Sequence, residues 1–105
     1  MEFESFKASV SKDEPPEGLN TAAKALWWDA KGDWAKAHQC AQADDGETGA
    51  WVHAYLHRKE GDMRNAGGWY SRAGRVPGEG PLDDEWQALA KEMLTIQAVA
   101  DGGRH

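Results

Sequence analysis

Apolar residues recur every three or four positions along most of the chain, which is the spacing that places them on one face of an α-helix. No segment shows the alternation of apolar and polar residues that is typical of a β-strand. The pattern therefore predicts an all-α fold. We expect two antiparallel helical hairpins, at residues 20–43 and 48–75, followed by a C-terminal capping helix at residues 82–101.

Polar residues at the ends of these segments predict how the helices start and stop. Asn20, Asp33 and Thr48 precede apolar helical runs, and their short side chains can accept hydrogen bonds from the first free amides of a helix. Gly32 and Gly61 each precede an aspartate and can adopt the left-handed conformation that ends a helix. Each Gly-Asp pair therefore predicts a tight turn between two helices.

The first 17 residues differ in composition from the rest. They contain five acidic residues, two lysines and the pair Pro15-Pro16, which removes backbone donors and disfavours helix at Glu14. We expect a flexible N-terminal arm over residues 1–17 and a single helical domain over residues 18–105.

Two features concern how the later helices pack. Gly67-Gly68 lies inside the fourth predicted helix at a cost of about 2 kcal/mol relative to two alanines, so we expect close helix contact there. The last helix carries one narrow apolar seam with an average spacing of about 3.5 residues. This seam can cap the hairpins or pair with a second copy of the chain as a homodimer; its residues are Leu82, Trp86, Leu89, Met93, Ile96 and Ala100.

Two short runs share the form charged-Gly-Asp-x-x-x-Ala, namely residues 31–37 and 60–66, and they begin 29 residues apart. The second run, extended to Ala73, resembles the second half of a tetratricopeptide or Sel1-like repeat. Gly61, Ala66, Tyr70 and Ala73 occupy the glycine, small, aromatic and small positions of that pattern. The resemblance implies stacked helical hairpins that bind a protein or peptide segment.

Residues 51–62 also resemble the signature of a small family of uncharacterised microbial proteins. This second resemblance implies no activity.

Composition narrows the functional classes. The chain has 12 basic and 18 acidic residues, a formal charge of -6, and no cluster of lysine or arginine, so we expect no nucleic-acid binding. Cys40 is the only cysteine, which excludes an intramolecular disulfide. Because residues 1–7 lack the positive charge of a signal peptide and no window has the apolar length of a membrane span, we expect a cytoplasmic protein that binds no membrane.

One group of residues could bind a metal ion. His53 and His57 are four residues apart and Glu60 is three further on, so a helix brings all three within a narrow arc. Ala54 follows His53 where a zincin protease needs glutamate. The apolar pattern places both histidines opposite the buried face, so we expect surface or packing histidines and keep the metal site as the alternative.

A second group could bind a partner. Trp51, Tyr55 and Arg58 share a stripe on the third predicted helix, with Lys59 at its edge. In tetratricopeptide-like modules this helix lines the concave face, where such side chains can hold an acidic or C-terminal peptide. The same aromatic residues suit a core between hairpins. We expect a non-enzymatic protein-protein interaction module with no catalytic residues and no cofactor; its partner is a protein or peptide.

Overall fold

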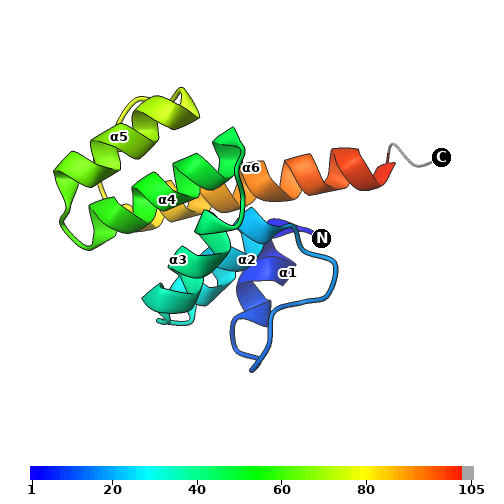
Figure 1. The fold of residues 1–105 in the computed structure, drawn as a ribbon. Helices are drawn as coiled ribbons and strands as arrows, with labels where there is room; N and C mark the ends of the chain where they lie inside the picture. The colour runs from blue at the N-terminus through cyan, green and yellow to red at the C-terminus, as the bar shows by residue number, and fades with distance from the viewer. Residues whose placement is uncertain (103–105) are drawn as a thin grey trace.

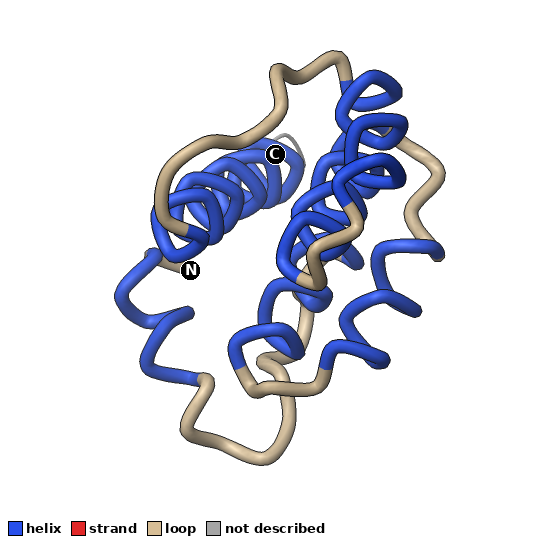
Figure 2. Tube along the Cα trace, turned by 90° about the vertical axis from the view of Figure 1, so that its left-hand side faces the viewer, coloured by secondary structure: helices blue, strands red, loops and turns tan. Residues whose placement is uncertain are grey.

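The computed structural model describes residues 1–102; residues 103–105, at the end of the predicted domain, lie outside the described part. Residues 1–102 form helices joined by turns and loops, with no β-strand among them, which confirms the all-α class (Figures 1 and 2). The helices are α1 (Phe3–Ser9), α2 (Thr21–Ala30), α3 (Trp34–Gln42), α4 (Glu47–Lys59), α5 (Met63–Ala73) and α6 (Leu82–Gly102).

Side-chain caps fix three helix starts, two of them at the predicted caps Asn20 and Asp33 and the third at Asp62. The Asn20 side chain accepts a hydrogen bond from the Ala23 amide at 2.8 Å. Asp33 and Asp62 do the same for the third residue of α3 and of α5. Each cap satisfies an amide that has no partner within its own helix.

The two Gly-Asp turns have the same geometry. Gly32 and Gly61 have φ values of 91° and 89°, in the left-handed region that glycine adopts without steric cost. The next amide then donates back to a carbonyl five residues earlier, from Asp33 to Trp28 and from Asp62 to His57, at 2.9 Å in both cases. The predicted tight turns are confirmed.

The start of α4 differs from the prediction. The helix begins at Glu47, one residue before Thr48, and its N-cap residue Gly46 has no side chain to make a capping bond. Thr48 instead donates its hydroxyl to the Asp44 carboxylate at 2.9 Å. Asp44 also accepts from the Gly46 amide, so the aspartate organises the loop before the helix.

The prediction of a flexible N-terminal arm over residues 1–17 is wrong for Phe3–Ser9, which form α1. Phe6 is fully buried, and its ring stacks on Trp86 of α6 with centroids 5.9 Å apart. The Lys31 ammonium bonds to the carbonyls of Val10 and Lys12, just after this helix. Apolar burial therefore holds the segment despite its acidic composition.

Helix α6 packs against α1, α2 and α4 with the first part of its apolar seam. Leu89 and Met93 are buried, whereas Ile96 is 40% exposed. Figure 1 shows the C-terminal end of this helix extending past the other helices. Pairing of this end with a second copy stays a prediction. No helix in the described part of the chain has the length and apolarity to cross a membrane.

Helix α4 lies at the centre of the fold and contacts α2, α3, α5 and α6. Its buried residues join two apolar clusters, one with Val52 and Leu56 and a smaller one with Ala54. Helix α5 covers the second cluster with Ala66 and Tyr70. The side chains of α4 that face α3 and α5 are therefore shielded from solvent.

The expected close contact at Gly67-Gly68 is wrong. A Cβ atom built on either glycine meets nothing within 4 Å, and Gly68 is exposed. These two glycines are not required by packing in this structure.

Candidate metal centre

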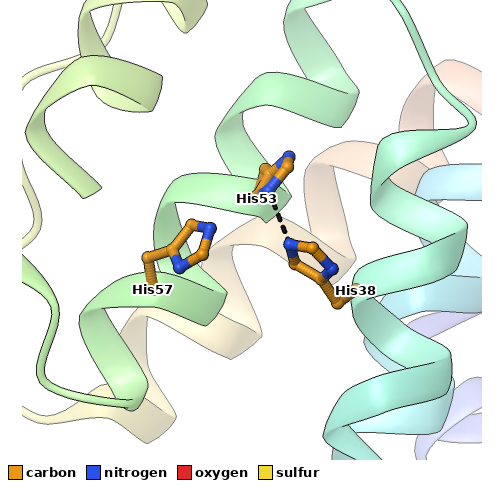
Figure 3. A group of neighbouring side chains, drawn as sticks. All are labelled: His38, His53 and His57. Atoms are coloured by element: carbon orange, nitrogen blue, oxygen red, sulfur yellow. Dashed lines mark hydrogen bonds between the residues drawn. The ribbon is translucent and has the colours of Figure 1, made fainter. Parts of the chain in front are cut away.

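Three histidines from two helices meet between α3 and α4. His38 extends from α3, and His53 and His57 extend from successive turns of α4 (Figure 3). One ring nitrogen from each lies within 4.8 Å of those of the other two. His53 and His57 are 3% and 7% exposed, whereas His38 is half-buried. The three imidazoles therefore form a largely buried cluster in which His38 is the most exposed member.

Two of the rings contact each other directly. The Nε2 atoms of His38 and His53 are 2.8 Å apart, which is a hydrogen bond in which one ring donates and the other accepts (Figure 3). The bond turns both Nε2 atoms toward the space between the helices.

The third ring is oriented by a carboxylate. Oε1 of Glu60, the C-cap residue that follows α4, lies 2.7 Å from Nδ1 of His57. A neutral His57 donates its Nδ1 proton to Glu60, so its Nε2 atom carries the free lone pair. This carboxylate–histidine pair is the arrangement that orients metal-binding histidines in many proteins.

Aromatic rings hold the imidazoles from both sides. Trp34 stacks on His38 with centroids 4.8 Å apart, and Trp69 of α5 stacks on His53 at 3.8 Å. Trp34 is itself fixed, because its Nε1 donates to the Leu56 carbonyl at 3.0 Å. The walls restrict the rotamers of the two rings, which limits the entropy that they lose when they bind an ion.

Burial keeps these rings neutral. Burial first, and then the smaller repulsions of His38, His57 and Arg72, together lower the pKa of His53 to about 4. Burial also lowers the pKa of His38, and the repulsion of His57 adds to this while the Glu60 carboxylate opposes it. Both rings are therefore neutral at neutral pH, the form in which imidazole binds metals. The ring that donates its Nε2 proton in their hydrogen bond must move that proton to Nδ1 before its Nε2 atom can bind an ion.

The predicted trio of His53, His57 and Glu60 is only partly brought together. Among the described residues, two groups have the spacing of metal ligands: the three histidines, and His57 with Glu60 and Asp62. Glu60 contacts His57 but belongs to a different group from His53. The expectation that both histidines face away from the core is wrong, because α3 and α5 pack over that side of α4.

His38 is the residue that the sequence analysis misses. It lies 15 residues before His53, on a different helix, so no local spacing links the two. The two residues meet because α3 packs against α4, the helix that follows it after one loop.

The predicted partner stripe is occupied by contacts within the chain. Tyr55 is 2% exposed, and its hydroxyl donates to Asp29 at 3.0 Å. Burial, and then the Asp29 carboxylate, raises the pKa of this phenol. Lys59 forms an ion pair with the same carboxylate at 2.9 Å. Tyr55 is thus a core residue, which is the alternative that the sequence leaves open for the stripe, and partner binding through this helix stays a prediction.

The other two stripe residues are also engaged. Arg58 forms an ion pair with Glu85 at 2.7 Å and donates to the Gly80 carbonyl. Trp51 is half-buried, and the Arg75 guanidinium lies 3.8 Å from its ring centroid. The stripe therefore joins α4 to α2, to α6 and to the segment between α5 and α6.

No protein-family model, curated protein or solved structure matches this chain. The tetratricopeptide-like resemblance and a protein partner accordingly stay predictions. The histidine cluster is the part of the described structure whose geometry points to a defined chemistry.

Proposed function

We propose that this protein binds a divalent transition-metal ion, such as zinc, through His38, His53 and His57. The observation that carries the proposal is the convergence of three imidazole nitrogens from two helices within 4.8 Å in a largely buried place. Imidazole is a preferred ligand of zinc, copper, nickel and iron. The proposal keeps the histidines of the sequence-based alternative and replaces Glu60 with His38 as the third ligand.

Binding requires the three rings to rearrange around the ion. Tetrahedral zinc with bonds of about 2.0–2.1 Å places its ligand nitrogens about 3.3 Å apart. The Nε2 atoms of His38 and His53 are 2.8 Å apart, so the ion would replace their hydrogen bond and separate them by roughly half an ångström. His57 must come closer, and its orientation is already fixed by Glu60.

The direct test is to measure the metal content of the full chain, produced without a histidine tag and loaded with zinc sulfate before desalting. We expect one zinc ion per chain by elemental analysis. His38→Gln should reduce the content below stoichiometry while circular dichroism stays unchanged, because His38 is half-exposed and its replacement leaves the apolar core intact.

His105→Gln is the matched control, since it removes the one remaining histidine of the sequence. Absence of stoichiometric zinc from the parent chain would falsify the proposal. Equal zinc affinity in the parent and in His38→Gln, measured by competition with a chromophoric chelator, would also overturn it.

A further inference from the structure

We infer that a metal ion at this centre keeps one coordination position for an exchangeable ligand, and that this position takes a small inorganic anion, or water in its absence. The inference rests on the proposed function. It adds a binding activity to the metal site.

The first argument is the number of donors. Among the described residues, the group around the two facing Nε2 atoms contains three histidines and no carboxylate or thiolate. Glu60 is positioned on the Nδ1 side of His57, so it reaches the ion only through that ring. Zinc sites with three protein ligands take water or substrate in the fourth position, whereas structural zinc sites use four protein ligands.

The second argument is access. His38 is half-buried, while the other two histidines have exposures below 10%. A cavity of about 90 Å³ lies beside His53, but neither His38 nor His57 lines it. The half-buried edge of His38 is therefore the side from which water or a small anion reaches the ion.

The third argument is charge. Three neutral imidazoles leave the two positive charges of the ion uncompensated, and Glu60 supplies one negative charge through His57. The Arg72 guanidinium also acts electrostatically on His53. Asp44 and Asp45 line the cavity beside His53 together with Arg72, so the positive charge that attracts an anion is that of the ion itself. An anion in the fourth position therefore completes the charge balance.

The experiment uses the full chain loaded with Co²⁺ in place of zinc, because the visible absorption of Co²⁺ reports the identity and number of its ligands. Sodium azide is the probe. We expect the visible bands to shift with increasing azide and to saturate at one azide per cobalt, in the parent chain and in the His105→Gln control.

The outcomes separate the two proposals. If the chain does not bind Co²⁺ or Zn²⁺, the proposed function fails. If the chain binds Co²⁺ but azide leaves the visible bands unchanged, the metal site stands and the exchangeable position is wrong. If azide shifts the bands only in Glu60→Gln, Glu60 is the fourth ligand and the inference is overturned.

Discussion

Glu60 illustrates how one side chain can set the chemistry of another without being a ligand. Its carboxylate lies 2.7 Å from Nδ1 of His57, and it is 39% exposed while the imidazole is buried. Because the carboxylate holds one ring nitrogen, the other nitrogen has a defined direction. The role of this residue is therefore to position His57.

This role predicts a graded response to substitution. Glu60→Ala should weaken zinc binding by about 10- to 100-fold, the usual effect of losing a partner that orients a metal ligand. Glu60→Gln should be less harmful, because its amide oxygen can still accept the Nδ1 proton. Chelator competition measures both affinities. Glu47→Gln, which changes an exposed acid at the other end of α4, is the control.

Protonation of His53 gives a second prediction, for the metal-free protein. Its pKa is about 4 when folded and near 6.5 when unfolded, so the unfolded chain binds more protons between these values. The contribution to stability is present above pH 6.5 and is lost as the pH falls toward 4. Chemical denaturation at pH 7.5 and 4.5 should therefore show a larger loss of unfolding free energy for the parent than for His53→Gln.

The informative quantity is the difference between the parent and His53→Gln in how much unfolding free energy each loses. Carboxylates also titrate in this pH range, and they contribute to the loss in both proteins. An equal loss in both chains would remove His53 as a source of the pH dependence.

Among the elements, α5 combines strong caps with a weak interior. Asp62 caps its first turn, and Gly74 ends it with φ at 68°. Between them, Gly67 and Gly68 lower the helical propensity and have no neighbour within 4 Å of a built Cβ. The helix is therefore held by its ends and by the burial of Ala66 and Tyr70 rather than by its own propensity.

Gly68→Ala should consequently stabilise the protein by about 1 kcal/mol. Gly49→Ala provides the contrast, because a Cβ there would lie 2.3 Å from the Asp44 carbonyl oxygen and should destabilise the chain by about 1–3 kcal/mol. Thermal unfolding of both variants measures the two effects. A loss of stability in Gly68→Ala would show that the interior of α5 makes a contact absent from this structure.

The helix ends show what local sequence can predict. Asn20, Asp33 and Asp62 act as caps because capping depends on residues within one turn, and that information is local. Thr48 fails as a cap because Asp44, four residues earlier, accepts its hydroxyl proton. A choice between two local hydrogen bonds depends on how the loop folds, which the sequence pattern does not specify.

At the scale of the whole molecule, the N-terminal segment completes the core. Phe6 enters the main apolar cluster from α1, and Phe3 packs edge-on against Trp86 at 6.0 Å. Glu2 and Glu4 flank Phe3, and residues 1–17 contain five acidic residues, so the average composition predicts a solvated arm. The burial of Phe6 and the partial burial of Phe3 in one short helix outweigh the effect of that composition.

Phe6→Ala should therefore lower the free energy of unfolding by about 3–5 kcal/mol, a large fraction of the stability of a small domain. Val76→Ala serves as the control, because Val76 is 87% exposed and should change little. Urea denaturation compares the two variants. If Phe6→Ala is as stable as the parent, α1 is not part of the core in solution.

The candidate metal centre could be predicted only in part, because its residues come from two helices that meet in the fold. His53 and His57 belong to one helix, so their spacing reveals the pair. His38 joins them only because α3 packs on α4, and their inward direction follows from α3 and α5 lying on that side. A site whose residues come from different helices depends on tertiary packing. The local spacing of residues in one sequence does not predict that packing.

The stacking of Trp34 and Trp69 on the histidine rings gives the centre a built-in optical signal. An open-shell ion such as Cu²⁺ bound to these imidazoles would lie within a few ångströms of both indoles and would quench their fluorescence. The other tryptophans of the chain, such as Trp27 in the core, lie in other surroundings. Occupancy of the centre can therefore be followed by light emission from the unlabelled protein.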